Sequence, residues 1–111
     1  MAQEKAPIGA DVKFLVDIAS PGFDMSRDDF SVTLTRGAVS VTYKKSDEDP
    51  MDEYEHFVVD SDGNYYVCFS TATFGKGLIT ATVTAYVPDE DFDDETRTEI
   101  EKFDLLNVVS L

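Results

Sequence analysis

The strongest constraint on the fold is a strict two-residue alternation from Ile79 to Val87, in the segment that begins at Leu78. Aliphatic side chains occupy every second position of this segment, and threonine or tyrosine occupies the positions between them. Successive side chains of a β-strand point to opposite faces of a sheet, so this period buries one face and leaves the other towards solvent. Pro88 ends the segment because it has no N–H to donate to a neighbouring strand. The segment is therefore predicted to be a long strand of an antiparallel sheet.

Six further segments have strand-like patterns, separated by turns that contain glycine, proline or aspartate. The seven predicted strands begin at about residues 11, 30, 39, 54, 65, 78 and 99. Asp62-Gly63 is the pair favoured in a two-residue type I′ hairpin turn, and Arg36-Gly37 is predicted to turn a second hairpin. Seven short strands with no convincing helix predict an all-β fold, a two-sheet antiparallel immunoglobulin-like sandwich. Residues 11–111 are expected to form this single domain, preceded by a flexible arm over residues 1–10.

The charge of the chain excludes several classes of partner. Its 111 residues include 9 Lys and Arg against 23 Asp and Glu, a formal net charge of −14 at pH 7. Such a surface repels phosphate, so nucleic acids and anionic lipid headgroups are not expected as partners. No segment approaches the roughly 20 apolar residues of a membrane-spanning helix, and no apolar signal-peptide core follows Met1. We therefore expect a protein made in the cytoplasm without a signal peptide.

The residues that usually carry catalysis are scarce. The only cysteine, Cys68, excludes an internal disulfide and a cysteine-based zinc site, and its mid-strand position predicts a small buried side chain. The only histidine, His56, lies in a predicted strand with no serine or cysteine motif beside it. Covalent catalysis needs a nucleophile activated by a base or by a lowered pKa. The sequence therefore predicts a protein that is not an enzyme.

Carboxylates are common enough to raise the alternative of a calcium site. Residues 60–64 resemble the middle of a calcium-binding loop, but Phe69 stands where the closing glutamate would be, and a hairpin turn explains the same residues. A second acidic loop, over residues 89–98, is denser in carboxylates and is expected to contain at most one helical turn. A solvated loop and docking on a basic partner are the alternatives there. The candidate ligands for Ca²⁺ in this second loop are Asp89, Asp91, Asp93 and Asp94.

Several apolar side chains are candidates for contact with another protein. Phe23 and Phe92 are lone aromatic residues in polar loops and are expected to tuck under those loops as anchors. The C-terminal residues 105–111 are largely apolar, and an exposed strand edge there could pair with a neighbouring chain. The alternative is that they pack on the sheet of their own chain. The candidate partner-binding residues are Phe23, Phe92, Leu106, Val108 and Leu111.

The order of four short motifs resembles that of a known module. The motifs are GFDMSRDDF (residues 22–30), YYVCF (65–69), FGKGL (74–78) and VPDEDFDDETR (87–97). In this order they resemble small β-sandwich modules of phages and mobile elements of gut Bacteroidetes, which are similar to the N-terminal domain of phage baseplate upper proteins. The resemblance covers about residues 12–101. This chain departs from the pattern in two ways. Many such modules have a glycine where this chain has Glu95. The module is usually the N-terminal part of a longer fibre-like chain, whereas the given chain stops after the sandwich.

The resemblance implies a non-enzymatic structural protein of a tailed-phage virion. Because the given chain stops after the sandwich, an acidic capsid auxiliary or decoration protein is the favoured form, with a tail, baseplate or fibre-attachment adaptor as the alternative. Its partners would be capsid or baseplate subunits, and oligomers in the assembled particle stay an open alternative. A calcium-dependent module that binds carbohydrate or a cell surface is the alternative from another class.

Overall fold

The structure, a computed structural model, describes residues 5–25, 27–45 and 57–110. These residues confirm the predicted all-β class, and none of them forms a helix long and apolar enough to cross a membrane. Short 3-10 helices, η2 (Thr71–Thr73) and η3 (Asp93–Glu95), connect some of the strands. The strands are β1 (Lys5–Pro7), β2 (Asp11–Val16), β3 (Phe30–Arg36), β4 (Val39–Lys44), β5 (Phe57–Val59), β6 (Tyr65–Ser70), β7 (Gly77–Pro88) and β8 (Thr96–Val109).

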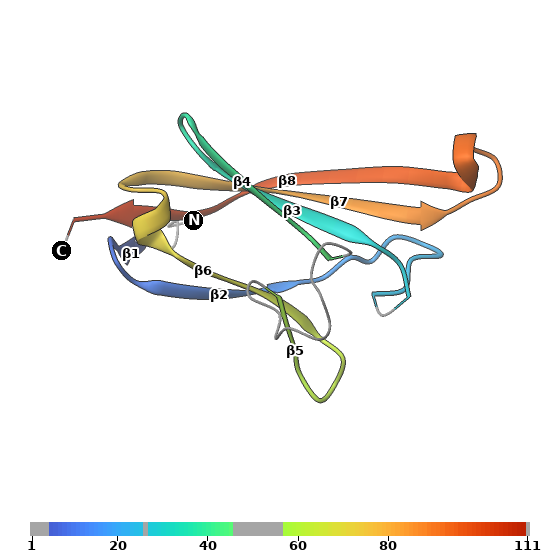
Figure 1. Cartoon of the computed structure of the whole chain (residues 1–111), viewed down its shortest axis with the longest axis horizontal. Coiled ribbons are helices and arrows are strands. Elements are labelled where there is room, and N and C mark those ends of the chain that lie inside the picture. The colour runs from blue at the N-terminus through green and yellow to red at the C-terminus, as the bar shows by residue number, and fades with distance from the viewer. Residues whose placement is uncertain (1–4, 26, 46–56, 111) are drawn as a thin grey trace.

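The strands form two layers (Figure 1). The larger sheet has the order β1-β8-β7-β3-β4, and the smaller has the order β2-β6-β5. Paired strands run antiparallel except β1 and β8, which are parallel. If β2 to β8 are read as strands B, C, C′, D, E, F and G, this is the strand order of a variable-type immunoglobulin sandwich. The predicted immunoglobulin-like sandwich is therefore confirmed, with β1 as an eighth strand among the described residues.

Both predicted hairpins are present, one joining β3 to β4 and the other joining β5 to β6. The second turn differs from the predicted type I′. Gly63 has a positive φ of +84°, whereas Asp62 does not, and the Gly63 N–H donates to the Asp60 carbonyl at 3.1 Å. A type I turn followed by a left-handed glycine is a three-residue hairpin loop with a G1 bulge. That loop needs one positive-φ residue rather than two, so glycine is required only at position 63.

The core lies between the layers and is built from alternate residues of the facing strands. Phe30, at the start of β3, is fully buried, and its ring meets those of Phe57 and Tyr65 edge-to-face, with centroids 5.4 and 5.7 Å apart. Such pairs add to the stabilisation from burial itself. The predicted inward face of β7 is confirmed, since none of its side chains is more than 8% exposed: Ile79, Ala81, Val83, Ala85 and Val87.

Part of the predicted N-terminal arm is tied to the sandwich. Lys5–Pro7 forms β1, in parallel register with residues 107–109 of β8. Thr71, which is fully buried, fixes the chain that follows: its hydroxyl donates to the Pro7 carbonyl at 2.8 Å and accepts from the Ala10 N–H at 3.0 Å. In the part of the predicted arm that the structure describes, Lys5–Pro7 and Ala10 thus have specific backbone partners.

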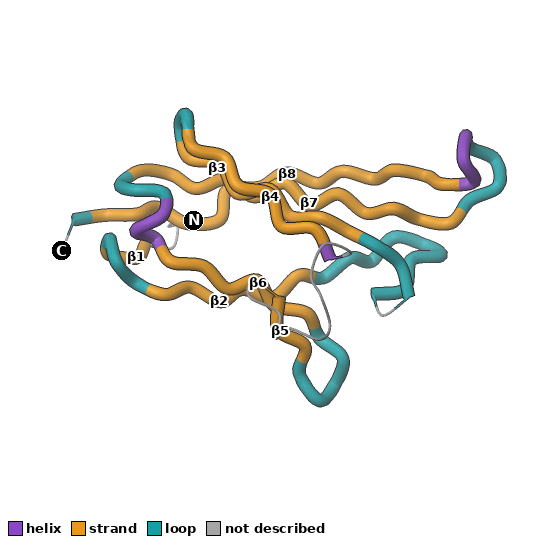
Figure 2. The backbone as a smooth tube through the Cα atoms, in the orientation of Figure 1, coloured by secondary structure: helices purple, strands orange, loops and turns teal. Residues whose placement is uncertain are grey.

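β8 begins earlier than predicted, at Thr96, and pairs with β7 to form a long two-stranded ribbon. The half of the ribbon that lies away from β1 extends past the smaller sheet, over the loop formed by residues 17–25 and 27–29 (Figure 2). Arg97 holds this loop by donating from Nη2 to the Pro21 carbonyl at 2.8 Å. A loop rather than a strand therefore forms the second layer beneath this half of the ribbon.

The covering loop is fixed from within by Asp28, whose side chain is 7% exposed. Its two carboxylate oxygens accept from the Arg27 guanidinium at 2.8 and 2.7 Å, and one of them also accepts from the Asp24 N–H at 2.9 Å. The Lys45 ammonium donates to the Met25 carbonyl at 2.8 Å. The hydrogen bonds from Arg27 are the main cause of a lowered pKa for the Asp28 carboxyl.

Asp28→Asn is expected to lower the free energy of unfolding at pH 7 by about 1–2 kcal/mol, because a neutral amide loses the charge-assisted hydrogen bonds. Since the folded pKa of Asp28 is lowered, the stabilisation is complete above the unfolded pKa of about 3.9 and is lost as pH falls through the folded value. Urea unfolding at pH 7 and pH 3 measures the change. A wild-type-to-variant difference that stays the same at both values would contradict this role. Asp17→Asn, at an exposed position, is the control.

Candidate protein-binding surfaces

The acidic loop lies at the tip of the ribbon, between β7 and β8. A hydrogen bond of 2.9 Å from the Asp89 N–H to the Glu95 carbonyl closes it. The Asp89 carboxylate accepts from the Asp91 N–H at 3.1 Å and forms an ion pair with Arg97. The Asp91 hydrogen bond and then Arg97 lower the pKa of Asp89. Asp89 therefore serves the geometry of its own loop.

The predicted calcium ligands of this loop are not brought together. Within residues 5–25, 27–45 and 57–110, no group of three or more His, Cys, Asp or Glu side chains is arranged to hold a metal ion. Calcium takes six to eight oxygen ligands, and a carboxylate that is paired with an arginine is a poor contributor to such a set. The described structure therefore gives no support to a calcium site built from Asp89, Asp91, Asp93 and Asp94.

The other acidic turn, over residues 60–64, also uses its carboxylate internally. The Asp60 carboxylate accepts from the backbone N–H groups of Asn64 and Asp62, both at 2.9 Å. It also accepts from the Tyr66 hydroxyl at 3.3 Å. The backbone hydrogen bond from Asn64 is the largest cause of the lowered pKa of Asp60. These contacts support the hairpin-turn interpretation of this segment over the calcium-loop one.

Two consecutive residues of the acidic loop have a left-handed backbone. Asp94 has φ +56° and Glu95 has φ +54°. Aspartate visits this conformation readily, but in other residues the Cβ crowds the following carbonyl at a cost of roughly 1–2 kcal/mol. A glycine at position 95 would be free of that crowding. The conformation of the loop thus explains why glycine suits this position.

Glu95→Gly is expected to raise the free energy of unfolding by about 0.5–1 kcal/mol, because relief of the left-handed strain exceeds the entropy that glycine loses on folding. Glu90→Gly removes the same side chain from a residue of the same loop that lacks a positive φ, and it should destabilise the protein. Thermal unfolding of both variants measures the two signs. Destabilisation by Glu95→Gly of the size seen at Glu90 would rule out the strain.

Phe23 and Phe92 have different environments. Phe23 is partly buried, and its ring packs edge-to-face on Phe30 with 6.4 Å between the centroids. Phe23 therefore anchors its loop to the core, as predicted for a tucked aromatic residue. Phe92, which was also expected to tuck under its loop, is instead 52% exposed. The tip of the ribbon lies beyond the smaller sheet, so Phe92 has no second layer to pack against.

The C-terminal strand corrects two of the predicted partner contacts. Leu106 and Val108 are only 4% and 2% exposed, because they point into the core of their own sandwich. β1 covers the outer edge of residues 107–109. The structure thus favours the alternative of packing on the chain's own sheet. Leu111 lies outside the described residues.

β8 has a long open edge that the sequence did not reveal. β1 pairs only with residues 107–109, and no other described strand pairs with the outer edge of β8 over residues 96–106. Unpaired N–H and C=O groups at such an edge can accept a further strand. Two large apolar side chains lie on this segment, Ile100 with 68% and Phe103 with 37% of their surface exposed.

A bulge in β8 decides which of its side chains point outward. The register against β7 shifts at Leu105, which is an extra residue in the pairing. A shift of one residue reverses the faces of all the residues beyond it. Phe103, Glu101 and Glu99 consequently share the inner face with the buried side chains of β7, and Ile100 points to the outer face. A continuous alternation from the buried end of β8 would have turned Ile100 inward.

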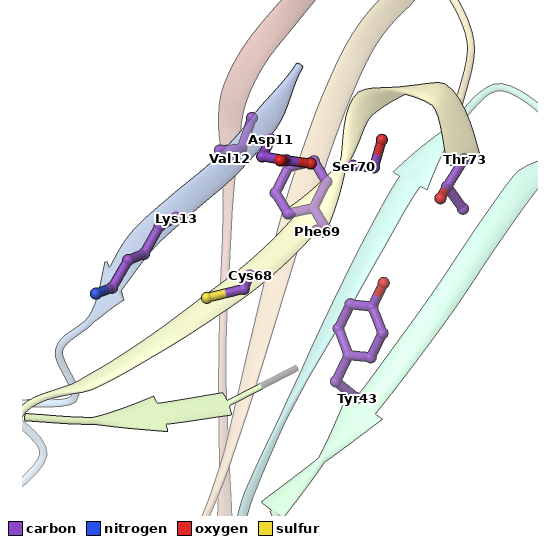
Figure 3. A pocket seen from close by; sticks show the side chains of 8 residues that line it. All are labelled: Asp11, Val12, Lys13, Tyr43, Cys68, Phe69, Ser70 and Thr73. Atoms are coloured by element: carbon purple, nitrogen blue, oxygen red, sulfur yellow. The ribbon is translucent and has the colours of Figure 1, made fainter. Parts of the chain in front are cut away.

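A groove of about 500 Å³ lies beside the end of β6 that pairs with no described residue of β5 (Figure 3). Tyr43, from β4, lines one side of it, and burial raises the pKa of its hydroxyl. Cys68 also lines the groove and is partly exposed, contrary to the prediction, because it points to the outer face of β6. The Lys13 ammonium lies 4.7 Å from the centroid of the Tyr66 ring. Polar groups from β2, β4 and β6 therefore line the groove. His56 lies outside the described residues.

No protein-family model, curated protein or solved structure matches the chain. The two most exposed large apolar side chains of the described residues are Ile100, at 68%, and Phe92, at 52%; Leu15 on β2 is 50% exposed. Ile100 and Phe103 lie on the open edge of β8, and Phe92 lies at the tip of the same ribbon. All three lie on the β7–β8 ribbon, so this ribbon is the candidate binding surface of the protein.

Proposed function

We propose that this protein is a non-enzymatic structural component of a tailed-phage virion, an acidic capsid auxiliary or decoration protein that acts by binding its neighbours. The observation that carries the proposal is the open edge of β8, where unpaired backbone groups and the exposed Ile100 face outward. The motif order shared with phage β-sandwich modules supplies the virion context. Unpaired backbone groups at an exposed strand edge can accept a strand of another chain.

In this role the ribbon attaches the sandwich to the particle, and the rest of the surface faces outward. Contacts of specific protein complexes bury on the order of 800 Å² per partner, and an elongated protein measuring 49 × 30 × 25 Å has room for that along one side. A net charge of −14 on the outer surface would keep particles soluble and apart. The alternative site of attachment is the tail or baseplate, which the resemblance to baseplate upper proteins favours.

The direct test is binding of the purified protein to capsids and to tails isolated separately from the phage that encodes it. Sedimentation at moderate salt should carry the protein down with capsids. Ile100→Asp should abolish that binding, and Thr42→Asp should not. Thr42 is an exposed residue of β4, the strand at the opposite edge of the same sheet. Binding to tails alone would favour the adaptor, and binding to neither would exclude both forms of the proposal.

A further inference from the structure

We propose that the open edge of β8 takes an extended segment of a partner protein that places a lysine or arginine against Glu99 and Glu101. This inference rests on the proposed function and names the chemistry of the segment that binds. Addition of a strand to a sheet edge draws its affinity from main-chain hydrogen bonds and its specificity from the side chains that alternate along the added strand. The residues around this edge indicate which side chain the added strand should carry.

The inner side of the edge is hollow. A cavity of about 210 Å³ lies between β8 and the loop that covers the ribbon. Its lining includes two acidic residues, Glu99 and Glu101, and the apolar residues Ile18, Val83, Ala85 and Ile100. In an added strand every second side chain would point to this inner side. A long side chain with an apolar stem and a cationic end suits a cavity with both kinds of wall.

One carboxylate oxygen of Glu99 has no hydrogen-bond donor among the described residues. The Oε2 atom of Glu99 is buried and accepts no hydrogen bond from the described residues, although the side chain as a whole is 38% exposed and its Oε1 atom lies 3.6 Å from Nε of Arg97. The other two nitrogens of Arg97 are directed to Asp89 and to the Pro21 carbonyl. A buried acceptor without a donor is costly and needs an explanation. A cationic side chain or an N–H of an added strand would supply the donor.

A second copy of this chain fits the edge poorly. A symmetric antiparallel pair sets residues of the same face opposite each other. Centring the pair on Glu99, Glu101 or Lys102 places that charge against its own copy. Centring it on Ile100 places Glu99 against Glu101. Like charges directly opposite each other are destabilising. A centre on Phe103 leaves only three paired residues in each copy before the bulge at Leu105. A centre on Thr98 places the acidic loop of each copy beside Glu101 of the other, so that like charges again lie opposite each other.

The outer side of the edge sets a second condition on the partner. Ile100 and Lys102 point outward there, and Ile100 is 68% exposed. An added strand with an apolar residue opposite Ile100 would remove that surface from water. The segment that fits therefore alternates cationic side chains on its inner face with apolar ones on its outer face.

The inference is tested with two synthetic eight-residue peptides, acetylated and amidated, and the full ¹⁵N-labelled protein. One peptide alternates Lys with Val, and the other replaces each Lys by Glu. In NMR titrations the lysine peptide should shift the amide signals of residues 96–106 most strongly, and the glutamate peptide should leave them unchanged. Equal shifts with both peptides, shifts centred on residues 89–95, or no shift at millimolar peptide would each overturn the inference.

A matched pair of double variants separates this edge from general attraction to an acidic protein. Glu99→Gln with Glu101→Gln should weaken binding of the lysine peptide on the order of tenfold, as expected for two lost ion pairs. Glu90→Gln with Glu95→Gln removes the same charge from the acidic loop, and it should change the affinity less than twofold. Equal weakening by the two double variants would mean diffuse electrostatic attraction, and the inference would fail.

The same variants distinguish this inference from the proposed function. If the protein sediments with capsids and Glu99→Gln with Glu101→Gln sediments equally well, the virion role stands and the cationic-segment inference fails. If the lysine peptide binds β8 but neither capsids nor tails bind the protein, the edge accepts the predicted chemistry and the virion role fails.

Discussion

Replacing Phe30 by alanine is expected to lower the free energy of unfolding by about 3–5 kcal/mol. Its side chain is fully buried, and its ring meets three aromatic rings edge-to-face, those of Phe57, Tyr65 and Phe23, at 5.4, 5.7 and 6.4 Å between centroids. The substitution leaves a cavity between the sheets and removes these ring contacts together. Small domains are stable by only about 5–15 kcal/mol, so a large part of the stability would be lost. Chemical denaturation followed by circular dichroism measures it.

Phe92→Ala is the matched control, because it removes the same side chain from a residue that is 52% exposed. Its effect should stay within about 0.5 kcal/mol. If both substitutions destabilised the protein equally, the position of Phe30 at the centre of the core would be wrong. If Phe30→Ala prevented folding altogether, Phe30→Leu, which fills much of the cavity, should restore a measurable unfolding transition.

Thr71→Val is expected to cost about 2–3 kcal/mol although valine has nearly the same shape. The hydroxyl of Thr71 donates to the Pro7 carbonyl and accepts from the Ala10 N–H, and valine can do neither. Each buried polar group that loses its partner costs roughly 1–3 kcal/mol. The loss should be local as well as global, because these bonds connect the chain between β1 and β2 to the end of β6. Hydrogen exchange of the Ala10 amide should accelerate more than that of the β7 amides.

Thr73→Val controls for the substitution itself, since Thr73 lies in the same 3-10 helix and is exposed. Its cost should be below about 0.5 kcal/mol. A cost for Thr71→Val no greater than that of the control would show that the two hydrogen bonds contribute little. Unchanged exchange at Ala10 would show that this threonine does not hold the N-terminal segment.

Two kinds of structure in this protein follow from local sequence. β7 was predictable because the pleat of a strand places every second side chain on one face, whatever surrounds it. The hairpin at residues 60–64 was predictable in position because Gly63 allows a backbone that other residues avoid. Its type was not, because one glycine suits both a two-residue and a three-residue loop, and the pairing of β5 with β6 makes the choice.

The proposed binding surface could be recognised only in the tertiary structure. Nothing in the sequence of β8 marks Leu105 as the extra residue, because a bulge is a mismatch of two strands and exists only in their pairing. That mismatch turns Ile100 out and leaves Leu106 in the core. The smaller sheet also ends before the tip of the ribbon, which leaves Phe92 uncovered. Periodicity within one segment therefore determined the strands and the class of fold. Which side chains meet solvent or a partner was decided between segments, because register and the extent of each layer depend on contacts far apart in the chain.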